Sequence, residues 1–215
     1  NGGRDVLLAY PLFGPGIPLF LYLNKRYPEV KFSFTVDYKK AAEDLEDQAG
    51  RERLTLRVFV DLDTGMHRTG MVPAQAGALI ESIQIHPLLS FQGLHIYDGH
   101  IHQADVEERK KQCDRDFEPV KALIKEMEGK GIQVEELACG GTPTFPIHAQ
   151  DPSRTLCPGT PLLWDAGYAA GFSDLDFLHA AVVAGRVISK PREHICLDLG
   201  HKSIASEMPQ PRLKF

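Results

Sequence analysis

The chain has 215 residues, of which 43% are hydrophobic and 25% are charged, a composition typical of a globular protein with a sizeable core. Its net charge of −5 and its pI near 6.0 argue against a nucleic-acid or anionic-membrane partner, because either would call for a basic face. No apolar run approaches the length of a membrane span, and the N-terminus does not resemble a signal peptide. We therefore expect a cytoplasmic location.

The four cysteines are widely spaced and form no Cys-x-x-Cys pair, which favours reduced thiols over a disulfide framework. The first residue is not Met, a weak indication that the chain has been cut. We expect a fragment that is truncated at both ends.

Short apolar runs alternate with amphipathic segments along the first 160 residues, a pattern typical of βα units around a parallel sheet. The apolar runs predict six strands, at residues 6–10, 31–36, 56–63, 91–97, 134–139 and 154–157. The amphipathic segments predict helices at residues 18–26, 38–49, 73–83 and 106–127. Within the last helix, we expect Pro119 to kink the helix or divide it in two.

Two α/β architectures fit this order of elements. The strand count does not exclude a doubly wound sheet. A (β/α)8 TIM-type barrel with about six of its eight strands fits equally well by pattern, and better by its glycines, which fall at the strand ends where barrel active sites lie. Residues 180–189 and 194–200 predict two antiparallel strands with no helix between them. We therefore expect a barrel domain at residues 1–176 and the beginning of a β domain at residues 177–215.

The run from Val58 to Gly70 reads as a strand buried on both faces that ends in a turn at Asp63. Arg68 follows in a loop between two glycines, where the backbone can bend tightly around an anionic or electron-rich group. From spacing alone, an ordinary surface arginine after a core strand is at least as good an interpretation.

Two glycine-rich loops follow the last two predicted strands. Gly140, Gly141, Thr142 and Thr144 offer backbone N–H groups and hydroxyls in the way that a phosphate is held without a lysine. A second donor cluster comes from residues 159–160, Gly159 and Thr160. Two tight turns are the alternative interpretation, because glycine and proline are the usual residues of turns.

The run from His95 to His102 allows two functions. Three histidines, His95, His100 and His102, with Asp98, could bind a metal. Tyr97 and His100 could instead contact a planar ring and relay protons.

Several motifs in this order resemble the D-threonine aldolase and D-serine dehydratase family. These are Val60-Asp-Leu-Asp-Thr-Gly-Met-His-Arg-Thr-Gly70, Tyr97-Asp-Gly-His100, Cys139-Gly-Gly-Thr-Pro-Thr144, Pro158-Gly-Thr160, Trp164-Asp-Ala-Gly-Tyr168 and Asp198-Leu-Gly-His-Lys-Ser203. The resemblance extends over nearly the whole chain. It implies pyridoxal 5'-phosphate (PLP) as cofactor and an alanine-racemase-like fold, a (β/α)8 barrel followed by a β domain.

The resemblance also implies roles for individual residues. Gly140, Gly141 and Thr142, with Gly159 and Thr160, would bind the cofactor phosphate, and Thr144 belongs to the same loop. Arg68 would lie near the cofactor phenolate oxygen or the substrate carboxylate, and Tyr97 or His100 would line the ring; these three are the predicted catalytic residues. Cys157 would lie near the pyridine nitrogen, where relatives often carry a basic residue.

Other features of the family are expected outside this chain. The lysine that binds the cofactor lies on the first barrel strand of the family, and none of the lysines here matches it. A divalent metal, Mn or Zn, is implied, with ligands beyond Phe215. A homodimer is implied because related enzymes complete each site with the β domain of the partner.

These observations favour a PLP-dependent lyase that cleaves D-3-hydroxy amino acids to glycine and an aldehyde, as D-threonine aldolase does. A D-serine dehydratase (an ammonia-lyase) and a non-catalytic PLP-binding barrel are the alternatives within the same fold. A metal-dependent hydrolase that uses His95, His100 and His102 is the alternative from another class.

Overall fold

The computed structural model describes residues 2–200 and 204, so the end of the motif at residues 198–203 lies outside the described residues. The chain forms two compact units, Asn1–Pro158 and Gly159–Phe215, and we describe each by itself. No helix in the described part of the chain combines the length and the apolar character that a transmembrane segment needs.

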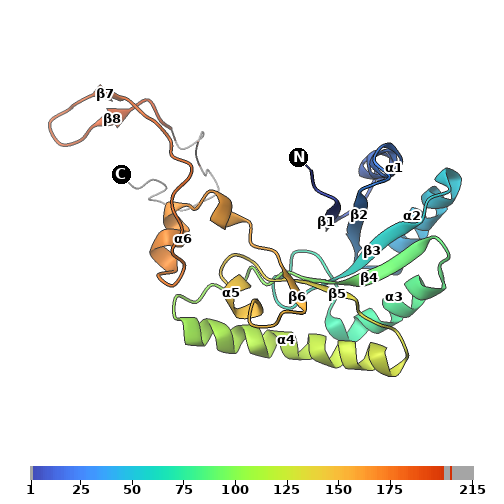
Figure 1. Cartoon of the computed structure of the whole chain (residues 1–215). Coiled ribbons are helices and arrows are strands. Elements are labelled where there is room, and N and C mark those ends of the chain that lie inside the picture. The colour runs from blue at the N-terminus through green and yellow to red at the C-terminus, as the bar shows by residue number, and fades with distance from the viewer. Residues whose placement is uncertain (1, 201–203, 205–215) are drawn as a thin grey trace. The chain divides into compact units, whose positions relative to one another are not determined.

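The first unit is a parallel sheet whose six strands lie in chain order, each hydrogen-bonded to the next (Figure 1). The strands are β1 (Asp5–Pro11), β2 (Lys31–Val36), β3 (Leu56–Leu62), β4 (Leu89–Ile96), β5 (Glu136–Cys139) and β6 (Arg154–Leu156). A doubly wound sheet reverses its strand order at a switch point, and this sheet does not. The fold is therefore a six-stranded part of a (β/α) barrel, and the predicted fold class is confirmed.

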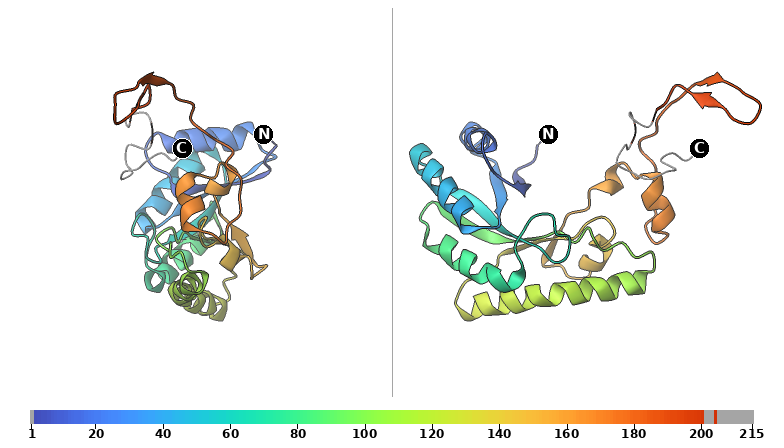
Figure 2. Two further views of the ribbon diagram at one scale, coloured as in Figure 1. Left: turned by 90° about the vertical axis from the view of Figure 1, so that its left-hand side faces the viewer. Right: turned by 180° about the vertical axis from the view of Figure 1, so that it is seen from behind.

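The helices between these strands are α1 (Gly16–Arg26), α2 (Lys39–Glu52), α3 (Pro73–Ile85), α4 (Val106–Gly129) and the short α5 (Phe145–His148). The longer helices cover one face of the sheet (Figure 1, Figure 2). All six predicted strands and four predicted helices are confirmed, with boundaries that shift by a few residues. The sequence analysis did not predict α5.

The two faces of the central strands differ in chemistry. On β3, Val58, Val60 and Leu62 are at most 2% exposed and pack into the core between the sheet and the helices. The intervening Phe59 and Asp61 are also buried, but on the other face, because successive side chains of a strand alternate. The inner face of the sheet therefore presents polar groups at the end of an otherwise apolar strand.

Helix α4 is continuous through Pro119, so the division of this helix, one of the two expected effects of the proline, is wrong, and the kink stays a prediction. Proline has no N–H to donate, which leaves the carbonyl of residue 115 without its helical partner. Pro119 and Arg115 both lie on the exposed side of the helix, where water can satisfy that carbonyl. Phe117 and Val120, on either side of the proline, are buried against the sheet and hold the helix in place.

The second unit contains a 3-10 turn at Thr160–Leu162, α6 (Ala166–Gly171) and the strands β7 (Val187–Ser189) and β8 (Cys196–Leu197). The two strands pair antiparallel, as predicted, but they are much shorter than residues 180–189 and 194–200. The sequence analysis missed α6, whose first N–H groups donate to the side chain of Asp165. The division at residues 158 and 159 precedes the predicted domain junction at 176 and 177, which stays a prediction.

We expect Gly93→Ala to destabilise the first unit severely. A Cβ atom at Gly93 would lie 1.9 Å from the backbone oxygen of Glu136, so β4 and β5 could not pair as they do. The loss of free energy of unfolding should exceed about 3 kcal/mol in urea denaturation followed by circular dichroism. Gly129→Ala, at the open end of α4, is the control and should be neutral or stabilising. Equal effects of the two substitutions would contradict this account.

Candidate active site

The polar residues singled out by the sequence follow the carboxyl ends of β3, β4 and β5, which lie at one edge of a parallel sheet. Asp61, which the sequence did not single out, is the last residue but one of β3, and its register partner on β4 is His95. Oδ1 of Asp61 lies 2.7 Å from Nδ1 of His95, and both residues are only 3% exposed. Oδ2 of Asp61 accepts a hydrogen bond of 2.8 Å from the Thr69 hydroxyl. Asp61 thus holds the loop that carries Arg68.

Arg68 and Tyr97, both predicted catalytic residues, are in contact. The guanidinium carbon of Arg68 lies 4.5 Å from the centre of the Tyr97 ring, a cation–π arrangement. A Cβ atom at Gly141 would lie 3.1 Å from the same ring, so the glycine loop after β5 also adjoins it. The structure therefore brings three of the predicted residues, Arg68, Tyr97 and Gly141, around one aromatic ring.

The turn before Arg68 is organised by Asp63. Its carboxylate accepts hydrogen bonds from the backbone N–H groups of Gly65 and His67, and Oδ2 lies 2.8 Å from Nδ1 of His67. Burial raises the pKa of Asp63, but the bonds from His67 and Gly65 outweigh burial and lower it overall. The carboxylate is therefore ionised at neutral pH and holds the backbone of residues 63–67 in this turn.

His100 lies beside this turn. Its Nε2 is 2.9 Å from Oδ2 of Asp116 on α4, and a Cβ atom at Gly65 would lie 2.6 Å from the same nitrogen. The Nδ1 atom is buried and has no hydrogen-bond partner within the described part of the chain. One nitrogen of His100 is thus anchored by a carboxylate, and the other is left for a further contact.

The loop from Gly140 to Thr144 is held from beneath. The Gly141 N–H and the Thr144 hydroxyl both donate to Oδ1 of Asp98, at 2.9 and 2.6 Å. Thr144 is fully buried, and Thr142 is 4% exposed. The Gly140 N–H also donates within the protein, to the carbonyl of Ile96 at 2.9 Å, so three of the groups predicted to face a phosphate bond to the protein itself. Phosphate binding by this loop stays a prediction, and the geometry gives Thr144 a contact inside the protein.

Cys157 follows β6, and its N–H donates to the carbonyl of Cys139 at 3.0 Å. Burial is the main cause that raises the pKa of this thiol, and Glu136 and Asp98 add to the effect. The side chain is therefore a neutral thiol at neutral pH. Gly159 and Thr160 begin the second unit, where Thr160 opens the 3-10 turn; their role in phosphate binding stays a prediction.

The metal site predicted as an alternative at His95, His100 and His102 is not formed in the described structure. His95 is paired with Asp61, His100 with Asp116, and His102 is exposed. These histidines follow one another in sequence, but the strand end and the loop direct them to different partners. Among the described residues, the potential ligand atoms that gather within 4.8 Å of one another belong to Asp98, Cys113 and His148.

Residues 24–162 match the family model for the N-terminal domain of alanine racemase. The chain belongs to this family. Among the curated proteins, this member of the alanine racemase N-terminal domain family is 29% identical over 148 residues to a 3-hydroxy-D-aspartate aldolase from Paracoccus denitrificans (strain Pd 1222). That match covers 67% of this chain and 38% of the relative.

Solved structures of the same fold agree with this assignment. D-threonine aldolase from Filomicrobium marinum is 26% identical and superposes with a TM-score of 0.82, covering 94% of this family member and 55% of the aldolase. D-threo-3-hydroxyaspartate dehydratase from Delftia sp. HT23 is 19% identical, with a TM-score of 0.66 over 76% of this chain and 44% of the dehydratase, and this likeness shows the fold alone. The chain thus spans about half the length of these relatives or less.

The sequence analysis missed the residues that hold the site loops. Asp61 is an acidic residue inside an apolar strand, and a buried acid of this kind indicates a paired carboxylate. Asp98 was considered only as a metal ligand. His148 lies in the unpredicted α5, and no sequence motif points to it.

We expect Asp116→Asn to lower stability at neutral pH, and the loss to shrink in acid. Burial raises the pKa of Asp116, but hydrogen bonds from His100 and Gln112 lower it overall. A carboxyl with a depressed folded-state pKa stabilises the protein above its unfolded pKa, near 3.9, and this contribution is lost as the pH falls through the folded-state pKa. The difference from the unsubstituted protein should be about 1 to 2 kcal/mol at pH 7.

The measurement is the free energy of unfolding at several pH values between 7 and 3. Asp114→Asn is the matched control, because Asp114 is a more exposed carboxylate of α4 that pairs with Lys110. Its effect should be small and screened by salt. A difference for Asp116→Asn that stays constant down to pH 3 would show that the charge is not involved.

Proposed function

We propose that this protein is a PLP-dependent lyase that cleaves D-3-hydroxy amino acids to glycine and an aldehyde, as D-threonine aldolase does. The observation that carries the proposal is the group formed by Arg68, Tyr97 and the Gly141 loop at the ends of three neighbouring barrel strands. The 29% and 26% identical relatives are both named as aldolases, which favours cleavage over dehydration.

The groups present at these strand ends fit an anionic aromatic cofactor. Arg68 supplies a permanent positive charge, while the nearby carboxylates of Asp61 and Asp98 are already engaged by donors of the protein. The absence of side chains at Gly140 and Gly141 lets a ligand come close to the backbone. The N–H groups of these two glycines donate to Ile96 and Asp98, so the donors to a phosphate would come from the residues that follow them. Thr142, and residues 159–160, are the further phosphate donors of the proposal.

PLP, when bound, supplies an electron sink for the electrons released when a bond to the α carbon breaks. Residues of this chain would position the cofactor and the substrate and would supply positive charge to the site. The Arg68 guanidinium would bind an anionic oxygen of the cofactor or the substrate carboxylate, and its contact with Tyr97 limits its freedom. Nδ1 of His100, with Nε2 held by Asp116, is the candidate to accept or return a proton at the substrate hydroxyl.

Cys157 belongs to the proposal as the residue near the pyridine nitrogen. A neutral thiol cannot form an ion pair with a pyridine nitrogen, and it offers only a weak hydrogen bond. If Cys157 faces that nitrogen, the protein would not fix the charge of the ring from that side. A divalent metal, Mn or Zn, and a homodimeric assembly belong to the proposal, and we assign neither to particular residues of this chain.

Product analysis tests the activity. The protein expressed from its complete gene should convert D-threonine and D-3-hydroxyaspartate to glycine when PLP and Mn²⁺ are present. Release of acetaldehyde from D-threonine identifies cleavage, and release of pyruvate and ammonia from D-serine would identify the dehydratase instead. A protein that binds PLP but turns over none of these substrates would be a non-catalytic carrier. Activity on L-enantiomers alone would refute the proposal.

Substitution of Arg68 tests the role of the guanidinium. Arg68→Met removes the charge while keeping a long apolar side chain, and should lower kcat/KM by roughly ten- to a hundredfold. Arg68→Lys keeps the charge without the planar fork and should be affected less. Arg51→Met, on the exposed side of α2, is the matched control and should behave as the unsubstituted enzyme. Equal activity of the Arg68 and Arg51 variants would exclude Arg68 from the site.

A further inference from the structure

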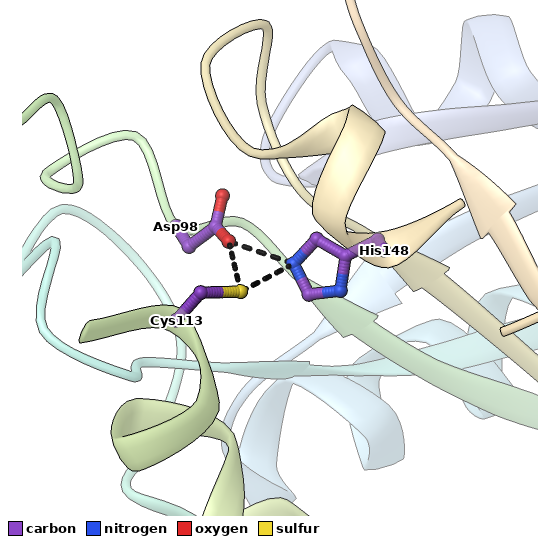
Figure 3. Close-up of side chains that lie close together, drawn as sticks. All are labelled: Asp98, Cys113 and His148. Carbon is purple, nitrogen blue, oxygen red and sulfur yellow. Dashed lines mark hydrogen bonds and ion pairs between the residues drawn. The ribbon is translucent and has the colours of Figure 1, made fainter. Parts of the chain in front are cut away.

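A buried polar cluster lies beneath the loop that follows β5. Asp98, Cys113 and His148 are at most 3% exposed and come from the loop after β4, from α4 and from α5 (Figure 3). Oδ2 of Asp98 lies 2.8 Å from Nε2 of His148, and the Cys113 sulfur lies 3.4 Å from the same nitrogen. Such a set of ligand types within 4.8 Å is also what a metal site would offer.

Arg154 decides between these two interpretations. Its Nη1 lies 2.7 Å from Nδ1 of His148, and its guanidinium carbon lies 4.0 Å from the centre of the Phe117 ring. A guanidinium can only donate, so Nδ1 must accept and the imidazole proton must be on Nε2. Nε2 therefore donates to Asp98. A metal on Nε2 would require a proton on Nδ1, and two donors would then face each other at 2.7 Å.

The thiol agrees with this assignment. Burial, followed by the nearby charge of Asp98, raises the pKa of Cys113 to about 12. A metal ligand would have to be a thiolate. Cys113 instead acts as a weak donor, with its sulfur 3.9 Å from Oδ2 of Asp98.

The other oxygen of Asp98 connects the cluster to the loop above. Oδ1 accepts from the Gly141 N–H and from the Thr144 hydroxyl, so one carboxylate holds both ends of the glycine loop and α5 together. Gly140 has φ +80, and a Cβ atom there would lie 2.7 Å from the His148 ring, so the loop rests directly on the imidazole. The conformation of the loop is thus set by an Arg154–His148–Asp98 chain.

We propose that Asp98 is a positioning residue, which holds the Gly140–Thr144 loop in the conformation that binds a phosphate group. Arg154 supports this role because it fixes His148 in the tautomer that donates to Asp98. This inference rests on the proposed binding of PLP. The buried cluster of Asp98, Cys113 and His148 then fixes the conformation of this loop and does not bind a metal.

Asp98→Asn breaks the arrangement whichever way its amide is placed. With the amide NH2 toward His148, two donors meet, because Arg154 prevents the imidazole from changing tautomer. With the NH2 toward the loop, it faces the Gly141 N–H. We expect at least about a tenfold weaker binding of PLP and less than about a twofold change for pyridoxal, which lacks the phosphate. Absorbance or fluorescence titration of the protein expressed from its complete gene measures both.

Substitution of Thr144 tests the same arrangement by removing only one of the hydrogen bonds to Asp98. Thr144→Val replaces the hydroxyl by a methyl group of similar volume, and should weaken PLP binding selectively, whereas Thr144→Ser keeps the hydroxyl and should bind PLP normally. Equal weakening of PLP and pyridoxal, or no change in either, in both Asp98→Asn and Thr144→Val would overturn the inference. An unsubstituted protein that binds PLP no more tightly than pyridoxal would refute the proposed function itself, and this inference with it.

Removal of Arg154 should partly rescue Asp98→Asn. In the double variant Asp98→Asn, Arg154→Met, the imidazole is free to carry its proton on Nδ1 and to accept from the amide of residue 98. PLP should then bind several-fold more tightly than to Asp98→Asn alone, although each substitution by itself is unfavourable. Additive losses in the double variant would contradict the proposed role of Arg154.

Cys113→Ala separates the loop-positioning role from a metal centre. The variant should keep the PLP affinity of the unsubstituted protein, because the thiol is only a weak donor to Asp98. Zn²⁺ or Co²⁺ that binds the unsubstituted protein at this cluster and is lost in Cys113→Ala, with a thiolate absorbance band for Co²⁺, would overturn the inference.

Discussion

Two buried carboxylates, Asp61 and Asp98, are the constraint on which the arrangement of the site depends. Each lies at or just after the end of a barrel strand and accepts from a buried histidine. Asp61 also accepts from the loop that follows its own strand β3, and Asp98 accepts from the loop that follows the neighbouring strand β5. A buried carboxylate loses its hydration, and without hydrogen-bond donors from the protein this loss of free energy would not be compensated. The cost of burying the charge therefore forces the loops to bring their donors to these oxygens, and the loops after β3 and β5 are fixed in consequence.

The partners of both carboxylates are imidazole, hydroxyl and backbone amide groups, and neither carboxylate contacts a lysine or arginine directly among the described residues. Asp61 is bound by an imidazole and a hydroxyl, and Asp98 by an imidazole, a hydroxyl and a backbone amide. The nearest guanidinium to Asp98, that of Arg154, acts through His148 and not by direct contact. Direct ion pairs would be tighter, but a hydrogen-bond set with fixed directions specifies the loop geometry more narrowly. Among the described residues, neither Asp61 nor Asp98 pairs with Arg68, whose guanidinium lies over the Tyr97 ring.

The sequence was sufficient to predict the sheet because its signals are local. The apolar run from Val58 to Leu62 and the glycines that follow each strand mark βα units without reference to distant residues. The sequence predicted that Arg68 and Tyr97 lie at the same edge of the sheet, since strand ends meet there, but it did not predict that the two side chains are in contact. The contacts of His148 with Asp98 and Cys113 could not be predicted, because they join α5 to the loop after β4 and to α4, which are far from α5 in sequence. The wrong expectation at Pro119 has the same origin: whether a proline breaks a helix depends on which side of it faces water.

The charged and neutral groups at the described strand ends limit the chemistry that the site can support. Cys157 and Cys113 are neutral thiols, the carboxylates of Asp61 and Asp98 are bound by donors of the protein, and Arg68 supplies a permanent positive charge. In a racemase-type reaction, two groups must exchange a proton with the α carbon on opposite faces. For retro-aldol cleavage, one base that accepts the proton of the β hydroxyl is sufficient for bond breaking. A site with one anchored imidazole whose second nitrogen is unpartnered in the described structure, beside one guanidinium, suits the second task better than the first. Among the described residues, these groups therefore support the proposed cleavage over racemisation.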